Sequence, residues 1–173
     1  MLDHARFHLG VIAWVQGDDA RARSLLQESG ASAGATNPLR YLGLIACAAG
    51  EHQEAAQWFA EELTRLRQRG SRAALAVGLA DVATLAAVRE AWQPAVRLFA
   101  KAEALAQSEA AAFSLPAREH YVRAYARAQE ALGDNASAVA AAGQALTLEQ
   151  ALAEAEAVLH LDRNGAIGAS PVL

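Results

Sequence analysis

Two histidines near the start of the chain have the spacing of a metal-binding pair. His4 and His8 lie four residues apart, which places both imidazoles on the same face of a helix. A zinc enzyme needs a third ligand and often a glutamate between the two histidines, but the intervening residues are Ala5, Arg6 and Phe7. We therefore interpret the pair as a surface or groove pair, and we expect no metal and no other cofactor.

The densest group of carboxylates consists of Glu51, Glu54, Glu61 and Glu62. General acid–base catalysis needs carboxyl groups whose pKa is shifted in a pocket. These four are expected instead to form the solvated edge of a helix, because charged side chains along a helix usually face water.

Cys47 is the one cysteine, and it lies inside the apolar run 42–48. Away from a helix N-terminus or a neighbouring histidine, a thiol has little reason to ionise, so Cys47 is expected to be a buried small hydrophobic residue. The chain also has no glycine-rich phosphate loop. Together these features predict that the protein is not an enzyme; a small enzyme remains the least favoured of three alternatives.

The composition describes a globular chain of moderate size. It has 173 residues, of which 54% are apolar and 20% charged, and a formal net charge of −4. A mildly acidic chain is not expected to bind nucleic acid directly. Neither a signal peptide nor an apolar run long enough to span a membrane is recognisable, so we expect no membrane partner and a cytoplasmic protein.

Glycine, proline and capping residues divide this alanine-rich chain into helices. Asp18 and Asn37 are expected to cap helices, and Thr147 with Gln150 has the form of a capping box. The expected helices cover about residues 3–15, 19–29, 38–49, 52–69, 72–89, 94–108, 116–132, 136–145 and 148–160. Residues 1–160 are predicted to form a single helical-repeat domain, and residues 161–173 a flexible C-terminal tail.

Small residues recur at equivalent places and group the first eight helices into four hairpins. In each hairpin twelve residues separate the first marker from the second, and seven separate the second from the third. The four sets are Gly10, Ala22 and Ser29; Gly43, Ala55 and the larger Glu62; Ala83, Ala95 and Ala102; and Ala126, Ala138 and Ala145. Such residues let paired helices cross closely, and Leu26, Phe59 and Phe99 each follow a second-helix marker by four residues. The fourth hairpin has Ala142 at that place.

Residues 39–59, from Leu39 to Phe59, resemble a tetratricopeptide repeat. Four segments of the second half are similar to a narrower family, the C-terminal helical-repeat arm of large bacterial signalling ATPases with LuxR-type or winged-helix DNA-binding domains. These segments are residues 78–83, 95–105, 115–121 and 145–151. The resemblance covers about residues 39–158, although the arm's usual aromatic-rich stretch is replaced by the alanine-rich run 136–142.

The resemblance implies an all-α fold, a tetratricopeptide-like right-handed superhelix of about four helical hairpins plus a C-terminal capping helix. It also implies a non-catalytic protein–protein interaction module, the sensing or assembly arm of a bacterial signalling or transcriptional regulator. The ATPase and DNA-binding parts of such a regulator have no counterpart in these residues. The alternative is a homo-oligomerisation module that pairs through exposed end helices, either around Phe7 and Trp14 or through the last helix.

The first helices of the hairpins are expected to line a concave groove that binds a protein or peptide ligand. The residues placed there by their phase relative to the small markers are His4, Phe7, His8, Val11, Trp14, Arg40, Tyr41, Leu44, Asp81, Thr84, His120, Arg123, Arg127 and Glu130. Aromatic anchors with arginine at the rim suit such a ligand. The alternative is that Phe7, Trp14 and Tyr41 belong to the core or to an end cap.

Overall fold

In the computed structural model, residues 2–30, 37–108 and 115–161 are described, and they form nine α-helices and one short 3-10 turn. The helices are α1 (Leu2–Val15), α2 (Asp19–Glu28), α3 (Pro38–Ala48), α4 (His52–Arg69), α5 (Arg72–Val88), α6 (Trp92–Ser108), α7 (Leu115–Leu132), α8 (Ala136–Ala145) and α9 (Leu148–Leu159), with the turn η1 (Gly133–Asn135) before α8. The all-α prediction is confirmed, and each expected boundary lies within two residues of the observed one.

Local chemistry at the helix ends explains most of these boundaries. Asp18 accepts a hydrogen bond from the Arg21 backbone N–H at 3.1 Å, and Thr147 forms the expected capping box with Gln150. Gly70 ends α4 in the left-handed conformation, at φ 67°, which glycine adopts without steric cost. Asn37 was expected to cap α3, but its side chain makes no cap hydrogen bond and donates instead to Glu62.

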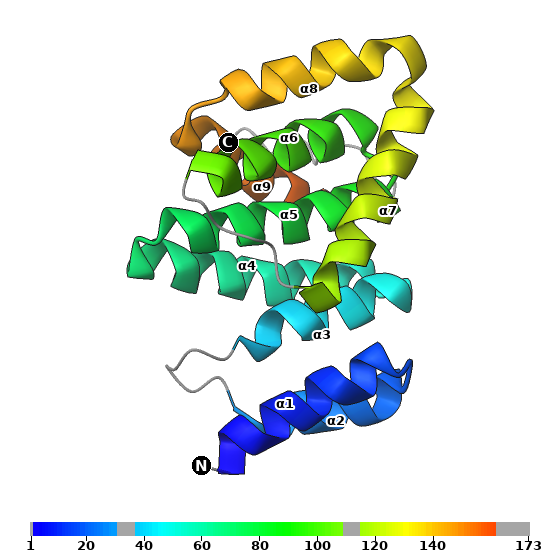
Figure 1. The fold of residues 1–173 in the computed structure, drawn as a ribbon, viewed down its shortest axis with the longest axis vertical. Helices are drawn as coiled ribbons and strands as arrows, with labels where there is room; N and C mark the ends of the chain where they lie inside the picture. The colour runs from blue at the N-terminus through cyan, green and yellow to red at the C-terminus, as the bar shows by residue number, and fades with distance from the viewer. Residues whose placement is uncertain (1, 31–36, 109–114, 162–173) are drawn as a thin grey trace, which may run out of the picture.

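Helices α1 and α2, α3 and α4, and α5 and α6 pack as sequential pairs (Figure 1). Small residues make the close crossings possible, as expected. A Cβ placed on Gly10 would stand 2.8 Å from Cγ of Leu26, and one placed on Gly43 would overlap the ring of Phe59. In the first two hairpins a large side chain of the second helix thus packs against the glycine of the first helix, as the sequence predicts.

The fourth expected hairpin differs from the first three. Helix α8 lies along α6 and barely touches α7, while α9 packs against α4, α5 and α6 (Figure 1). The markers Ala126, Ala138 and Ala145 are exposed, and the close approach occurs at Gly143, where a Cβ would overlap the backbone of Arg97. Because alanines supply no bulky knob between α7 and α8, α8 buries more surface on α6. The structure thus shows adjacent-helix packing, and a regular tetratricopeptide superhelix is not confirmed.

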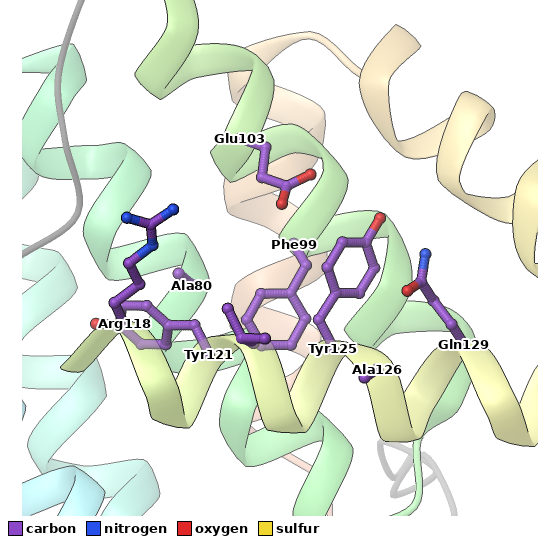
Figure 2. Close-up of a pocket in the computed structure, with 9 residues that line it drawn as sticks. Ala80, Phe99, Glu103, Arg118, Tyr121, Tyr125, Ala126 and Gln129 are labelled. Atoms are coloured by element: carbon purple, nitrogen blue, oxygen red, sulfur yellow. The ribbon is translucent and has the colours of Figure 1, made fainter. Parts of the chain in front are cut away.

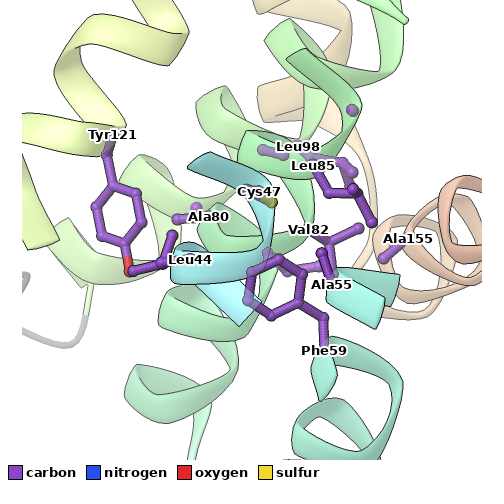
Figure 3. Close-up of a cluster of buried hydrophobic side chains, with 14 of the residues drawn as sticks. Leu44, Cys47, Ala55, Phe59, Ala80, Val82, Leu85, Leu98, Tyr121 and Ala155 are labelled. Carbon is purple, nitrogen blue, oxygen red and sulfur yellow. The ribbon is translucent and has the colours of Figure 1, made fainter. Parts of the chain in front are cut away.

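The core lies in the middle of the stack, where α3 to α6 meet α9 (Figure 3). Helix α5 is apolar on nearly all sides and is buried along most of its length. Burial raises the pKa of the Cys47 thiol to about 12, so Cys47 is the inert small residue that its sequence context predicts. Leu161, placed by the sequence in the tail, is buried in this core, and the rest of the proposed tail lies outside the described residues.

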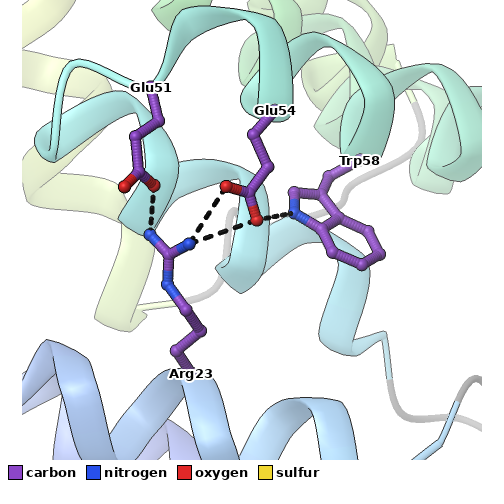
Figure 4. A network of polar contacts seen from close by, with 4 residues as sticks. All are labelled: Arg23, Glu51, Glu54 and Trp58. Atoms are coloured by element: carbon purple, nitrogen blue, oxygen red, sulfur yellow. Dashed lines mark hydrogen bonds and ion pairs between the residues drawn. The ribbon is translucent and has the colours of Figure 1, made fainter.

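Polar groups of α2 join the α1–α2 pair to α4. The Arg23 guanidinium bonds Glu51 with one nitrogen and both oxygens of Glu54 with another, the latter at 3.1 Å (Figure 4). Trp58 donates its indole N–H to the same Glu54 carboxylate. The carboxylates Glu51 and Glu54, which were expected only to face solvent, therefore hold two helix pairs together.

Candidate functional site

The face formed by α1, α3 and α5, which was expected to be an open groove, is partly covered by side chains from the first half of α7. We call this face the inner face. In Figure 1 helix α7 begins near α3 and runs diagonally past α5 and α6. Side chains of α7 reach all three helices, with His120 against Trp14 of α1 and Tyr121 against Arg40 of α3 and Asp81 of α5. These side chains fill part of the inner face, and a pocket of about 200 Å³ remains between α3, α5 and α7.

Aromatic side chains form a row between α1, α3 and α7. Phe7 and Trp14 both meet the ring of Tyr41 edge to face, with ring centres 5.8 and 5.1 Å apart. Trp14 also stacks on His120 at 4.7 Å. Partial burial lowers the pKa of His120, so the neutral imidazole is favoured in this position. The row attaches α1 to the rest of the molecule.

A buried polar cluster lies beneath α7. The Tyr121 hydroxyl accepts a hydrogen bond from Nε of Arg40 at 3.0 Å and donates one to Oδ1 of Asp81 at 2.6 Å. Nε of Arg40 is also 3.5 Å from the second oxygen of Asp81. Asp81 is fully buried and Arg40 nearly so. Burial is the largest influence on Asp81 and raises its pKa to about 6 against the opposing effect of Arg40.

Glu62 joins this cluster from α4, which corrects its expected place on a solvated helix edge. Its carboxyl group is fully buried and accepts a hydrogen bond from the Asn37 amide at 2.5 Å. Burial and the charge of Asp81 raise the pKa of Glu62 well above its ordinary value. Glu61, one residue earlier, points outward and pairs with Arg65. One step along the helix therefore separates a solvated carboxylate from a buried carboxyl group.

The structure divides the predicted groove residues into three groups. Exposed side chains are those of His4, His8, Arg123, Arg127 and Glu130. Partly buried ones are those of Phe7, Val11 and His120. Buried ones are those of Trp14, Arg40, Tyr41, Leu44, Asp81 and Thr84. The buried group was expected to contact a ligand directly, but α7 and the core cover it, since apolar and paired polar groups gain more from packing there than from facing water.

The exposed members of the set are not gathered at one point. His4 and His8 contact each other, with their Nε2 atoms 3.0 Å apart. Arg127 lies over the ring of Trp92 at 5.4 Å, and Arg123 pairs with Glu119 on its own helix. Arg123 and Arg127 line a pocket of about 200 Å³ together with Leu44, Thr84 and His120 of the predicted set, whereas His4 and His8 lie apart from it on α1.

A pocket of about 400 Å³ opens between α5, α6 and α7 (Figure 2). Phe99 forms its wall with Tyr121 and Tyr125, and Phe99 and Tyr125 stack with ring centres 5.1 Å apart. Arg118 and Glu103 stand at its rim, as Figure 2 shows. Partial burial raises the pKa of Glu103. The periodicity that marked Phe99 as a packing knob did not reveal this pocket, because it forms only where α7 crosses α6.

The most exposed apolar surface among the described residues lies on α1. Five large apolar side chains are exposed, and four of them belong to this helix, namely Leu2, Leu9, Ile12 and Val15. Successive spacings of seven, three and three residues place them along one side of α1. We call this the α1 stripe. Sequence analysis placed the interacting surface at Phe7 and Trp14 of the same helix, and those two side chains face inward instead.

Chemistry-bearing side chains are sparse elsewhere in the described ranges. Within residues 2–30, 37–108 and 115–161, no three His, Cys, Asp or Glu side chains are grouped so as to hold a metal ion. None of the helices in those ranges is both long enough and apolar enough to cross a bilayer.

The fold and the site define an all-helical protein of sequentially packed helix pairs, with α7 against part of the inner face. No family model, no curated protein and no solved structure matches the chain.

Proposed function

We propose that the chain is a non-catalytic protein–protein interaction module that docks through the α1 stripe. The observation that carries the proposal is the exposure of Leu2, Leu9, Ile12 and Val15 on α1 of the first helix pair. Helix pairs in a stack bury their apolar sides against neighbours, and a terminal pair that faces only water normally has a polar outer side. A contiguous apolar stripe at that end is therefore a docking surface.

The chemistry of the stripe defines its partner as a helix with an apolar side of similar length. Helix pairs interlock when rows of side chains on one helix fit between rows on the other. Arg6, which pairs with Asp3 and Glu28, borders the stripe on the adjoining side of α1. A partner helix with an apolar row and charged residues beside it can contact both the α1 stripe and the charged side chains around Arg6.

The resemblance of residues 39–158 to the helical arm of bacterial signalling ATPases supports the biological setting. On that basis we place the module in the sensing or assembly arm of a signalling or transcriptional regulator. The inner face favours docking at the α1 stripe rather than peptide capture between α1, α3 and α5, because side chains of α7 occupy part of that face and the pocket that remains has only about 200 Å³.

Self-association is the second candidate, and the α1 stripe favours it for a specific reason. The stripe carries apolar side chains from the first turn of α1 to the last, with the exposed His8 beside Ile12, so two copies can pair α1 against α1 around a two-fold axis with the same residues on both sides. Such a pair would bury the exposed leucines without a second kind of protein.

Site-specific photo-crosslinking in the producing cell tests the proposal. A photoreactive residue replaces Ile12 in one variant, and Gln144, an exposed residue of α8, in the control. Position 12 should give a discrete protein adduct and position 144 should not. An adduct of twice the chain's mass assigns the stripe to self-association, and one of another mass assigns it to a different protein. Equal labelling at both positions, or none at position 12, overturns the proposal.

Purified protein provides the independent measurement. In the double variant Leu9→Glu/Ile12→Glu, helicity and melting temperature should stay close to wild type, since exposed side chains contribute little to stability. When a photoreactive residue replaces Val15, the double variant should abolish the crosslinked adduct that forms in the otherwise wild-type chain. The matched control is Ala141→Glu/Gln144→Glu on the exposed side of α8. Light scattering over a concentration series then shows whether the wild type alone grows in mass and whether the double variant prevents it.

A further inference from the structure

The pocket between α5, α6 and α7 has the size and the walls of a site for a small molecule. Its volume of about 400 Å³ lies at the lower end of the range of roughly 300 to 1,000 Å³ that is usual for ligand pockets. Three aromatic rings line it, those of Phe99, Tyr121 and Tyr125. A cavity of this size with aromatic walls suits a compact ligand with an apolar part.

The aromatic wall is held in place by contacts on its far side. The Tyr121 hydroxyl accepts a hydrogen bond from Arg40 at 3.0 Å and donates one to Asp81 at 2.6 Å. The ring of Phe99 is buried, and Tyr125 stacks on it with ring centres 5.1 Å apart. A ligand therefore meets rings that already have their positions, so little ordering of side chains opposes binding.

An exposed apolar side chain also lines this pocket. Outside α1, Val122 is the single large apolar side chain that the described ranges leave exposed, with 59% of its surface accessible. It lies on α7 between the turns that carry the pocket residues Arg118 and Tyr125. An apolar group bound in the pocket would remove part of Val122 from water, which is favourable.

Two opposite charges stand at the rim of the pocket without a partner. Glu103 comes from α6 and Arg118 from α7, and Figure 2 shows both on the same side of the aromatic rings. Neither makes a hydrogen bond or an ion pair with the described part of the chain. Arg123, further along α7, is instead paired with Glu119. The rim thus offers a carboxylate to a cation and a guanidinium to an anion.

We propose that this pocket binds a free α-amino acid with a large apolar side chain. The side chain of the ligand packs against the aromatic wall, its ammonium group pairs with Glu103 and its carboxylate pairs with Arg118. An uncharged ligand would leave both rim charges unpaired, and a ligand with one charge would pair with only one of them. The pocket shares no residue with the α1 stripe, so binding here does not depend on docking there.

Calorimetric titration of the full chain with matched probes tests the proposal. L-Phenylalanine and L-leucine should bind, whereas glycine, which lacks the apolar part, should not. Phenethylamine keeps only the ammonium group and phenylpropionate only the carboxylate, so each should bind about tenfold more weakly than L-phenylalanine. The proposal is wrong if neither L-phenylalanine nor L-leucine binds at millimolar concentration, or if either single-charge probe binds as tightly as L-phenylalanine.

Two variants assign each charge of the ligand to its partner. Glu103→Gln should weaken L-phenylalanine binding about tenfold and leave phenylpropionate binding unchanged, because phenylpropionate has no ammonium group. Arg118→Gln should weaken L-phenylalanine binding to a similar extent and leave phenethylamine binding unchanged. Both side chains are exposed, so helicity should stay at the wild-type level.

The matched controls are Glu130→Gln and Arg123→Gln, which remove exposed charges of α7 outside the pocket. Both should bind L-phenylalanine as the wild type does. Val122→Glu adds a negative charge at the apolar side of the pocket and should reduce the binding of both amino acids severalfold. Unchanged binding of L-phenylalanine in Glu103→Gln and Arg118→Gln would place the amino acid elsewhere on the molecule and overturn the assignment of this pocket.

Discussion

The α1–α2 pair and the α3–α6 body have the same local design and a different degree of burial. In α1 only Gly10, Ala13 and Trp14 are buried, whereas most residues of α3 and α5 are buried. Both regions use a glycine to admit a large side chain from the second helix. The difference is position: the body is covered on several sides by α7, α8 and α9, and the first pair has neighbours on one side only.

The comparison shows that a helix pair inside a stack and one at its end are stabilised by different interactions. The body relies on apolar burial, which grows with every neighbouring helix. The first pair relies on its own crossing, on the row of Trp14 and Tyr41, and on the contacts of Arg23 with α4. We therefore expect the first pair to open locally before the body unfolds.

The largest contrast is expected from removing the buried knob of each region. Phe59→Ala should cost about 4 kcal/mol of unfolding free energy, because a fully buried aromatic leaves a cavity at the centre of the core. Leu26→Ala should cost about 3 kcal/mol, but only in the α1–α2 pair. Urea titration followed by circular dichroism gives the first value, and hydrogen exchange of α1 and α2 gives the second. Loss of protection throughout the body in Leu26→Ala would contradict two separable regions.

The two glycines at the crossings provide a sharper contrast. Gly43→Ala should destabilise the body by about 2 kcal/mol, since its Cβ overlaps the Phe59 ring in a packed interior. Gly10→Ala would place its Cβ 2.8 Å from Cγ of the buried Leu26, so it should also destabilise, but less, because the gain in helix propensity of about 1 kcal/mol offsets part of the cost. Melting temperatures of the two variants compare the effects, and equal destabilisation would mean that the end pair is packed as rigidly as the centre.

A smaller effect is expected at the junction between the regions. Arg23→Gln should weaken the attachment of the α1–α2 pair by about 1 kcal/mol, because a partly exposed charged group is screened by water and salt. Faster hydrogen exchange should appear in α1 and α2 alone, and less so in high salt. Arg123→Gln, which breaks an exposed pair within α7, is the control and should change neither region.

Thiol labelling separates the regions without altering stability. Burial keeps the pKa of Cys47 at about 12 in the folded protein, above the ordinary pKa that the thiol has in the unfolded chain. The free energy of unfolding should therefore fall as the pH rises from the ordinary pKa toward 12.

At pH 8 Cys47 should react with iodoacetamide only as fast as the body unfolds, whereas a cysteine from Ala5→Cys on exposed α1 should react at once. Fast labelling of Cys47 in native wild type would show that the body opens locally.

Much of the secondary structure was predictable because its signals are local. Glycine at a helix end, proline in a first turn and the Thr147–Gln150 capping box act within a few residues, so each helix was placed to within two residues. The small residues at Gly10 and Gly43 likewise predicted the first two crossings, because a close crossing leaves a fixed spacing along both helices. The general function, cofactor use, partners and cellular location remain predictions.

The candidate site was less predictable because burial depends on the whole stack. Glu61 and Glu62 are equally acidic in sequence, yet only Glu62 faces Asp81 and Asn37. The groove assignment placed Tyr41 and Asp81 on the correct side of their helices, but it did not show that α7 covers that side. The α1 stripe was recognisable only once Phe7 and Trp14 were found to point inward.

The sequence by itself determined the all-α class, the helix boundaries and the small-residue crossings, since these follow from backbone preferences and periodic spacing over a few turns. Only the tertiary structure decided where α7, α8 and α9 lie, which carboxyl group is buried and which side of α1 stays exposed. The physical reason is competition for buried surface: without a bulky knob between α7 and α8, α8 packs on α6 and α7 on the inner face. That outcome depends on distant helices and has no signature within any one segment.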